Sequence, residues 1–456
     1  MQIDFPPFVK KILHTFERSG YQIYIVGGVV RDLMLNRKTN DWDFATDATP
    51  EQILRLFPDG FYNNQFGTVG ITKEGEDKTN QNLSSTSYKP YEITTFRTEH
   101  GYSDKRRPDK VAWGKDLEED LSRRDFTINA MALPASKKVI DPFCGQEDLK
   151  KKLIRAVGNP ADRFSEDALR MMRAIRIAAE LGFTIEDNTF QAIKMHSDSI
   201  KHVSWERIRD ELFKILKSDF PDQGTMMLHA AGLLDYILPE LVAGIGVGQK
   251  SPQRHHVFDV YTHCLNALKN CPSKDPLVRL ATLLHDIGKV QTRKLTPKGI
   301  VTFYNHEIIG SRLVKEIADR LRLSKRQKDK LWVLVRWHQF SVDDQQTDSA
   351  LRRFIKNVGV ENLQDMLDLR VGDRLGGGVQ ETSWRLEKFK KRLEEVQHQP
   401  FSVKDLKVDG RDVMEILKIP SGPKVGEILQ KLFEEVEEDQ TKNEREYLLS
   451  RIKEIG

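Results

Sequence analysis

The stretch that decides the fold is YIVGGVVRDLMLNRKTNDWDF, residues Tyr24 to Phe44. An apolar run typical of a buried strand ends at two glycines, and a helical pattern follows directly. Glycine has no Cβ, so backbone N–H groups at this turn can approach phosphate oxygens closely. Arg31 can add a charge-assisted contact one helical turn later. The pattern predicts that Gly28 and Arg31 bind phosphate, although such a glycine pair is more often only a tight turn.

Two aspartates, Asp41 and Asp43, close the same stretch. On an extended strand, residues two apart project to one face, so both carboxylates converge while Trp42 points the other way, into the core. Oxygen ligands suit Mg²⁺, which fills its remaining positions with water and substrate phosphates. The alternative is a solvated turn, which an isolated Asp-x-Asp would favour.

The composition is that of an ordinary soluble chain with several subdomains: 456 residues, 39% hydrophobic and 31% charged. No apolar run approaches the roughly 20 residues that cross a bilayer, and the N-terminus does not resemble a signal peptide. We therefore expect a cytoplasmic protein with no membrane partner. The sparse cysteines, Cys144, Cys264 and Cys271, suit a reducing compartment and a structural role. The net charge of +4 permits an anionic partner such as RNA without requiring one.

Strand-like runs mix with helical patterns in the first third of the chain, which predicts an α+β head with a small mixed sheet. The runs are QIYIVGG (22–28), FGTVGIT (66–72), YEITTFR (91–97) and KKVIDPF (137–143). Polar segments at 72–90 and 98–116 are predicted to be loops. The rest of the chain is almost wholly helical. We expect a head at 1–148, a helical neck at 149–240, a histidine-rich helical domain at 241–378 and a helical tail at 379–456.

Two further motifs, EEDLSRRDFTINAMAL (118–133) and RFSEDALRMMRAIR (163–176), add clusters of arginines and carboxylates. Together with GG-x-VRD and D-x-D, they resemble the class II tRNA nucleotidyltransferase and poly(A) polymerase family, in order across residues 22–180. The segment VDGRDVMEILKIPSGPKVGEIL (408–429) is similar to the C-terminal region of bacterial members that carry an HD domain.

That resemblance implies a nucleotidyltransferase head in which Gly28 and Arg31 hold a triphosphate and Arg124 contacts the nucleotide. Asp41 and Asp43 would bind Mg²⁺ for two-metal transfer, with the RNA 3′-hydroxyl attacking the α-phosphate. A third carboxylate is common in this superfamily. Glu92 has the strand setting for that role, but it could equally be an exposed strand residue.

The helical pattern SEDALRMMRAIR predicts that Asp167, Arg170 and Arg173 share one helix face, with Arg176 further off it. An acceptor beside a donor matches the hydrogen-bonding edges of cytosine and adenine, whereas uracil and guanine present the reverse arrangement. The resemblance implies that Asp167 and Arg170 select the base, and that Arg173 and Arg176 add nucleotide contacts. Read alone, Asp167 and Arg170 are more simply a surface ion pair.

The second half contains histidine motifs that resemble the HD phosphohydrolase signature. The resemblance implies that His263, His285, Asp286 and Asp373 bind one metal, with His306 and His338 as candidates for a second. Imidazole and carboxylate ligands suit Mn²⁺, Ni²⁺, Fe²⁺ or Mg²⁺. A single histidine in an apolar helix is more often a packed core residue. The adjacent His-Asp of LLHDIGK, however, is costly to bury unless a cation compensates.

The resemblance implies an enzyme that adds CCA to tRNA 3′ ends with CTP and ATP, recognises tRNA by shape and backbone along its neck and tail, and hydrolyses phosphoesters in its HD domain. The segment 98–116 is positioned like the loop that the family needs for the final A, which argues against a CC-only enzyme. An A-adding enzyme or poly(A) polymerase is the nearest alternative. A protein that acts mainly as a phosphohydrolase is another. The sequence leaves the oligomeric state open.

Overall fold

The computed structural model describes residues 4–39, 41–62, 67–72, 90–100, 110–114, 116–249, 258–342, 346–378, 384–397 and 403–456. The chain divides into two compact units, one formed mainly by residues 1–242 and the other mainly by residues 243–456. The predicted fold class, an α+β head followed by helical regions, is confirmed. Within the described residues, we find no helix that is long and apolar enough to cross a membrane.

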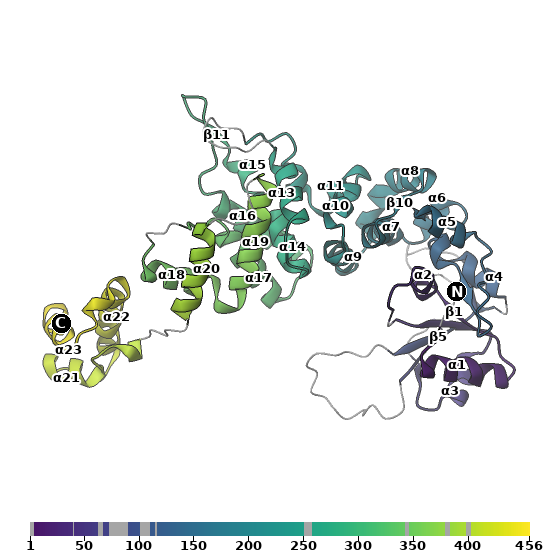
Figure 1. Cartoon of the computed structure of the whole chain (residues 1–456), viewed down its shortest axis with the longest axis horizontal. Coiled ribbons are helices and arrows are strands. Elements are labelled where there is room, and N and C mark those ends of the chain that lie inside the picture. The colour runs from purple at the N-terminus through teal and green to yellow at the C-terminus, as the bar shows by residue number, and fades with distance from the viewer. Residues whose placement is uncertain are drawn as a thin grey trace. The chain divides into compact units, whose positions relative to one another are not determined.

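A six-stranded mixed sheet forms the head, with the strand order β3-β4-β5-β2-β1-β8. Figure 1 labels two of its strands, β1 and β5. The strands are β1 (Ile23–Val26), β2 (Asp43–Thr46), β3 (Phe61–Tyr62), β4 (Thr68–Ile71), β5 (Tyr91–Thr95) and β8 (Ala132–Leu133). Strand β2 runs antiparallel to β1 and parallel to β5. The predicted strands at 22–28, 66–72 and 91–97 are therefore confirmed as β1, β4 and β5.

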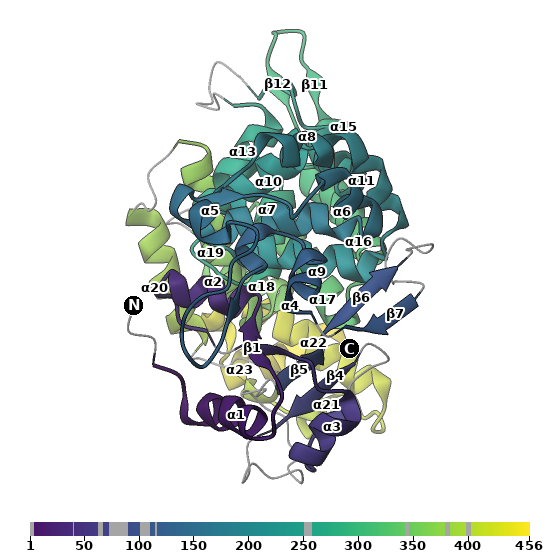
Figure 2. The ribbon, with the colours of Figure 1, turned by 90° about the vertical axis from the view of Figure 1, so that its right-hand side faces the viewer.

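Helices α1 (Pro7–Arg18) and α3 (Pro50–Leu56) cover one face of this sheet (Figures 1 and 2). Helix α1 buries a stripe spaced for this purpose: Val9, Ile12, Leu13 and Phe16. Trp42 is 6% exposed and packs edge-on against Phe5, 6.3 Å between ring centroids. The predicted alternation is confirmed, because Trp42 enters the core while the aspartates on either side face the opposite way.

The opposite face carries the carboxylates. Beside them, Ala45 of β2 packs with Phe96 and with Leu121 of α4 (Leu117–Ser122). Two predictions in this region were wrong. The run 137–143 makes only an isolated bridge between Ile140 and Ala132, since the adjacent Pro134 and Pro142 interrupt a ladder. The segment 98–116 is not all loop, because β6 (Arg97–His100) pairs with β7 (Lys110–Trp113) as a hairpin.

The neck follows as helices packed on one another. They include α5 (Gly145–Lys151), α6 (Pro160–Glu166), α7 (Leu169–Leu181), α8 (Asp187–His196), α9 (Trp205–Lys217) and α10 (Pro221–Ala230). The prediction of one helix carrying Asp167, Arg170 and Arg173 was wrong. Asp167 has extended backbone angles and separates α6 from α7. Its Oδ1 accepts from Leu169 N, 3.1 Å away, which caps the start of α7.

The second unit is mainly helical, with a short antiparallel pair of strands, β11 (Lys294–Leu295) and β12 (Val301–Thr302). Its first part contains α13 (Val260–Lys269), α14 (Pro276–Leu284), α15 (Lys289–Thr292), α16 (His306–Arg320), α17 (Lys325–Trp337), α18 (Asp348–Val358), α19 (Leu363–Gly376) and α20 (Trp384–Gln397). Residues Leu277–Leu284 of α14 are all buried, so this helix forms the centre of the bundle. Gly288 allows a close approach to α16, because a Cβ there would lie 2.1 Å from the carbonyl oxygen of His306.

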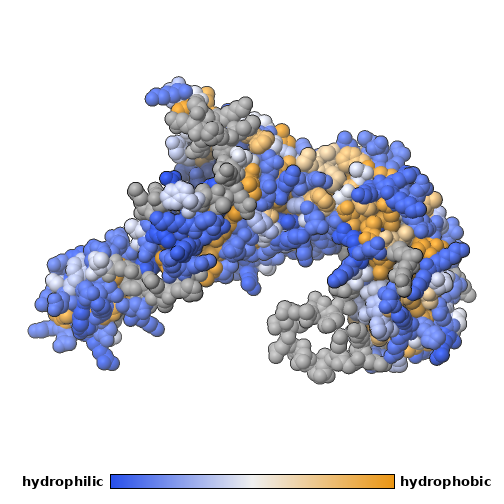
Figure 3. All heavy atoms as spheres, viewed as in Figure 1, coloured by the Kyte–Doolittle hydropathy of each residue, from blue (hydrophilic) through white to orange (hydrophobic). Residues whose placement is uncertain are grey.

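The tail has its own apolar core, formed by α21 (Gly410–Leu417), α22 (Pro423–Glu438) and α23 (Arg445–Ile455). Asp409 begins α21 with a capping box, in which its carboxylate accepts from the N–H groups of Arg411 and Asp412. Hydrophilic residues dominate the face of the tail that Figure 3 shows. The predicted helical tail is confirmed, and its helices are amphipathic, because Leu432, Val436, Leu448 and Ile452 are buried in the tail core.

Candidate active sites

The pairing of β2 with β5 brings two carboxylates together. Asp43 and Glu92 are register partners in the parallel ladder, so their side chains stand side by side on one face of the sheet. Both are half-buried, whereas Asp41, just before β2, is exposed. A cation beside this cluster would relieve the repulsion between neighbouring carboxylates. The paired carboxylates of Asp43 and Glu92 therefore fit a Mg²⁺ site, and Asp41 as a further ligand stays a prediction.

The glycine turn lies directly against this cluster. Gly27 has φ +80°, a backbone conformation that favours glycine, and it precedes α2 (Gly28–Met34). A Cβ on Gly27 would lie 3.1 Å from Arg124 Nη1 and 3.8 Å from Asp43 Oδ2. The structure thus brings the turn, Asp43 and Arg124 together. The close approach falls on Gly27 rather than on the predicted Gly28, which lies against the Arg31 guanidinium.

Arg31 is 8% exposed, and two side chains fix its guanidinium group. Its Nε lies 2.9 Å from Asp32 Oδ1, and its Nη1 donates to Asn129 Oδ1 over 3.0 Å. Asn129 in turn donates to Asp125 Oδ1, 3.1 Å away. These bonds fix the guanidinium relative to the Gly28 end of α2. A direct contact between Arg31 and a triphosphate stays a prediction.

Arg124 and its neighbour Arg123 share one buried carboxylate. Asp120 accepts from Arg123 Nη2 over 2.6 Å and from Arg124 Nη2 over 3.3 Å. Burial alone would raise the pKa of Asp120, but the two guanidinium groups outweigh it and lower that pKa. The carboxylate is therefore charged at neutral pH and orients Arg124 at the turn.

The neck side chains predicted to select the base each have a different partner. Asp167 Oδ2 lies 2.7 Å from Arg207 Nη2, and Arg173 Nη2 lies 2.7 Å from Asp125 Oδ2. Arg170 Nη2 donates to the carbonyl oxygen of Arg123 over 3.2 Å, which ties α7 to the segment beside the turn. Arg170 and Arg173 thus reach the head through Arg123 and Asp125, whereas Asp167 is paired with Arg207 of α9.

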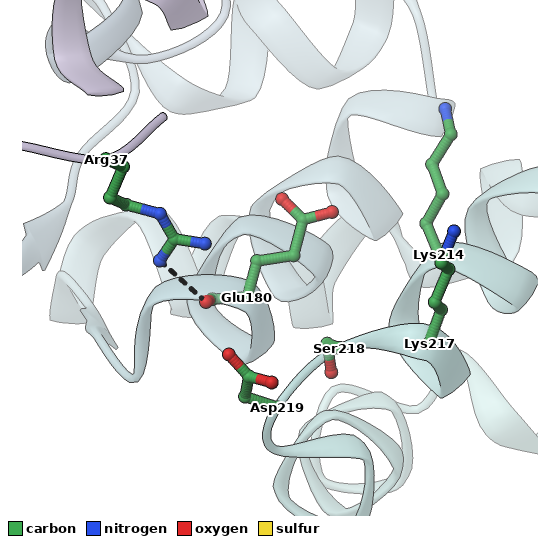
Figure 4. Close-up of a pocket in the computed structure, with 6 residues that line it drawn as sticks. All are labelled: Arg37, Glu180, Lys214, Lys217, Ser218 and Asp219. Carbon is green, nitrogen blue, oxygen red and sulfur yellow. Dashed lines mark hydrogen bonds between the residues drawn. The ribbon is translucent and has the colours of Figure 1, made fainter. Parts of the chain in front are cut away.

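Arg176 has two carboxylate partners, Glu211 and Glu180. Its Nε lies 2.7 Å from Glu211 Oε2 and its Nη1 lies 3.0 Å from Glu180, so its charge is already compensated. Beyond it lies a cavity of about 260 Å³, lined by Arg37, Glu180, Lys214, Lys217, Ser218 and Asp219 (Figure 4). Arg37 donates to the Glu180 carbonyl there, 3.2 Å away. This cavity is about 15 Å along α7 from Arg170, at 1.5 Å per residue, and it is not the nucleotide site.

In the second unit, six predicted ligands come together in two groups that share Asp286. His263, His285 and Asp286 form one, and Asp286, His306 and His338 form the other. Asp286 Oδ2 lies 3.3 Å from the Nε2 atoms of both His263 and His285. Its other oxygen, Oδ1, lies 3.3 Å from His306 Nε2 and 3.7 Å from His338 Nε2. Asp373 joins the first group, with its Oδ1 3.1 Å from His263 Nε2.

Backbone carbonyls orient three of these rings. The Nδ1 atoms of His285, His306 and His338 lie 2.8, 2.9 and 2.7 Å from the carbonyl oxygens of Thr282, Phe303 and Val335. An N–H at Nδ1 that donates to a carbonyl leaves Nε2 as the lone-pair atom, which is the arrangement of a metal ligand. The donor set therefore fits a divalent cation in each group.

The four family models that match cover most of the chain. They are the poly A polymerase head domain at 23–155, the probable RNA and SrmB-binding site of polymerase A at 182–244, the HD domain at 255–369 and the tRNA nucleotidyltransferase domain 2 at 313–452. The CCA-adding enzyme of Geobacillus stearothermophilus is 32% identical over 446 residues, 97% of this chain and 95% of that one. The chain belongs to the CCA-adding enzyme family.

A second relative, the CCA-adding enzyme of Geobacillus sp. strain WCH70, is 44% identical over 234 residues. The match spans 51% of the chain and 55% of that relative, about half of each. Among solved structures, the Bacillus stearothermophilus CCA-adding enzyme in complex with CTP has a TM-score of 0.69 and 28% identity, with 99% of this chain and 98% of that one covered. The Thermotoga maritima CCA-adding enzyme complexed with tRNA, 21% identical with a TM-score of 0.60, shares the fold.

In this member of the CCA-adding enzyme family, proton and metal should compete for His285. Burial alone would lower the pKa of His285, but Asp286 and Asp373 outweigh it and raise that pKa to about 10. A metal at Nε2 must expel this proton, so metal affinity should rise with pH up to about 10, by about tenfold per pH unit for each proton released. Calorimetric titration with Mn²⁺ at several pH values checks this. An affinity independent of pH between 6 and 9 would contradict it.

Several functional residues were missed from sequence. Lys289 is 7% exposed, and its Nζ lies 2.5 Å from Asp286 Oδ2 and 2.7 Å from Gln249 Oε1. Arg207, the partner of Asp167, lies on another helix, and no spacing along the chain indicates such a pair. Asp125 is the aspartate of the RRD motif, and it contacts both Arg173 and Asn129. Cys144, Cys264 and Cys271 form no disulfide.

Proposed function

We propose that this chain adds CCA to the 3′ end of tRNA without a template, using CTP and ATP, at the site formed by β2, β5 and the Gly27 turn. The observation that carries the proposal is the pairing of Asp43 with Glu92 directly beside Gly27 and Arg124. The relatives bound to CTP and to tRNA support this choice of substrates.

In this proposal, the turn and Arg124 bind the triphosphate while Asp41, Asp43 and Glu92 hold Mg²⁺. When bound, Mg²⁺ supplies charge stabilisation at the α-phosphate and makes the RNA 3′-hydroxyl a better nucleophile. The protein's own contribution is positioning. Asp120 fixes Arg124 over 3.3 Å, and Asn129 fixes Arg31 over 3.0 Å, so neither cation needs to reorganise when a nucleotide arrives.

The direct test is extension of tRNA transcripts that end at the discriminator base, at C or at CC, with Mg²⁺ and with CTP and ATP singly or together. CCA addition to the shortest transcript supports the proposal. Addition of A alone, and only to the CC transcript, would instead support an A-adding enzyme or poly(A) polymerase, the nearest alternative within the family. No extension of any transcript would refute both.

We further propose that Asp167 and Arg170 read the base. Arg207 pairs with Asp167 and Glu166 pairs with Arg170, whose Nη1 lies 2.5 Å from Glu166 Oε2. Together Asp167 and Arg170 would present an acceptor and a donor to the edge of a base. Arg173 belongs to the same cluster through Asp125. Arg176 is paired with Glu180 and Glu211, and its predicted nucleotide contact stays a prediction.

Asp167→Asn should relax the choice of nucleotide. The asparagine keeps the size of the side chain but replaces one acceptor oxygen with a donor, so the preference for CTP over UTP should fall at least about tenfold. Competing incorporation of CTP and UTP on one transcript measures it. Asp210→Asn is the matched control, since Asp210 is an exposed residue on α9 that pairs with Arg209. An unchanged preference in Asp167→Asn would exclude Asp167 from base selection.

For the second unit, we propose a phosphoesterase with two divalent cations, one in each ligand group and both bound by Asp286. A cyclic phosphate or 2′-phosphate at a damaged RNA end is the substrate class that suits an enzyme of RNA 3′ ends. Mn²⁺, Ni²⁺, Fe²⁺ and Mg²⁺ all fit imidazole and carboxylate donors. A protein that acts chiefly as this phosphohydrolase is the second candidate function. We also propose that the neck and the tail at 379–456 bind the tRNA body.

A further inference from the structure

We propose that Phe61 is a stacking platform for the base of the RNA nucleotide whose 3′-hydroxyl is extended. The inference rests on the proposed nucleotidyl transfer at Asp43 and Glu92. It assigns one aromatic side chain of the head, which none of the motifs contains, to the RNA end rather than to the incoming nucleotide.

The strand register puts Phe61 in line with the carboxylates. Phe61 of β3 pairs with Gly70 of β4, Gly70 pairs with Glu92 of β5, and Glu92 pairs with Asp43 of β2. Register partners project to the same face of a sheet. The four residues therefore form a straight row across the sheet, with the aromatic ring at one end and the two carboxylates at the other.

Gly70 leaves room for the Phe61 ring because it has no side chain. A Cβ on Gly70 would lie 2.5 Å from Phe61 Cζ, so the ring lies against the Gly70 backbone on the carboxylate face. Neighbouring strands are about 5 Å apart, and the ring is thus about one strand spacing from Glu92. Phe61 is nonetheless 44% exposed. The exposed ring lies beside a charged site. It can therefore stack on a planar group such as a nucleic-acid base.

The order of the strands indicates which substrate that partner belongs to. In the order β3-β4-β5-β2-β1-β8, the carboxylates lie on the two central strands. The phosphate-binding turn follows β1, on one side of them, and Phe61 is on β3, on the other side. An attacking hydroxyl and a triphosphate must meet at the carboxylates from opposite sides for in-line displacement. The side of Phe61 is therefore the RNA side.

Stacking on an aromatic side chain suits this task. It accepts any base, because every base has a π-face, and it contributes up to about a hundredfold in affinity per base. An enzyme that extends an RNA ending first in the discriminator base and then in C needs this tolerance at the primer end. The base-specific contacts are then reserved for the incoming nucleotide.

An aromatic ring that lies over a strand glycine can also stabilise the sheet without binding any ligand. The variants therefore separate stacking on an RNA base from packing over Gly70. Phe61→Leu keeps an apolar side chain over Gly70 but has no ring, Phe61→Ala removes both, and Phe61→Trp restores a ring. Tyr62→Ala is the matched control. Tyr62 is the next residue of the same edge strand, is 48% exposed and projects to the other face.

The experiment measures KM for a tRNA transcript ending in CC and KM for ATP, with the full-length variants. We expect Phe61→Leu and Phe61→Ala to raise KM for the RNA about tenfold and to leave KM for ATP unchanged. Phe61→Trp and Tyr62→Ala should match the wild type. A second transcript with an abasic 3′-terminal nucleotide should bind the wild type about tenfold more weakly and show no further loss with Phe61→Leu.

Three results would overturn the inference. They are an unchanged KM for RNA in Phe61→Leu, a raised KM for ATP in Phe61→Leu instead of a raised KM for RNA, or a Phe61→Leu effect that is as large with the abasic transcript as with the intact transcript. A wild-type protein that extends no transcript would refute the proposed function itself, which is a different outcome.

Discussion

Asp43→Asn should abolish nucleotide addition while leaving phosphoester hydrolysis by the same preparation intact. The substitution keeps the size of the side chain and its place in the β2–β5 ladder, but it removes half of the Asp43–Glu92 charge that would hold Mg²⁺. Loss of several kcal/mol of transition-state stabilisation corresponds to a rate lower by about a thousandfold or more. Single-turnover extension of a tRNA transcript ending in CC measures the effect.

Asp47→Asn is the matched control for this experiment. Asp47 lies just after β2, and its Oδ1 accepts from the backbone N–H of Gln22 over 2.8 Å, a bond that asparagine can also accept. Its addition rate should stay near that of the wild type. Rapid addition by Asp43→Asn would remove Asp43 from the chemistry, and loss of hydrolysis in that variant would contradict two separate sites.

The second large effect concerns metal content in the helical unit. Asp286 is the shared residue of the two ligand groups, so Asp286→Ala should lose both ions, whereas His263→Ala and His338→Ala should each lose one. Elemental analysis of protein purified with Mn²⁺ should give about two ions per chain for the wild type under this proposal. Hydrolysis of bis-p-nitrophenyl phosphate should disappear in Asp286→Ala, and CCA addition should continue.

Asp319→Asn serves as the control, because Asp319 is an exposed residue on α16, the helix that begins at His306. It should keep the full metal content. Retention of one ion by Asp286→Ala would show that the groups bind independently. A wild-type content of one ion per chain would reduce the proposal to a single-metal site.

The part of the head that follows the two-residue repeat of a strand could be predicted well from sequence. The alternation of Asp41, Trp42 and Asp43 follows from the two-residue repeat of a strand, and the structure buries Trp42 as expected. The neighbour of Asp43 could not be derived in the same way. Glu92 reaches it through a parallel pairing between strands far apart in sequence, and no local pattern specifies such a register.

In the neck, by contrast, a local pattern predicted the wrong structure. The helical repeat of SEDALRMMRAIR continues across Asp167, yet the chain leaves the helix there because the Asp167 carboxylate caps the next one. A residue type that favours caps outweighed the periodicity. In the second unit, the structure brings the six candidate ligands from the motifs together, but their division into two groups around Asp286 depends on the close approach at Gly288, which is a tertiary contact.

The parallel pairing of β2 with β5 has a consequence for folding as well. Successive side chains on a strand point to opposite faces, so a slip of one residue would place Tyr91 or Ile93 beside Asp43 and send Glu92 into the packed layer under α1. A chain misaligned in this way could still be compact and helical, but it could not assemble the carboxylate pair. Recovery of catalytic turnover after dilution from denaturant would therefore count only correctly aligned molecules, which circular dichroism cannot distinguish from the others.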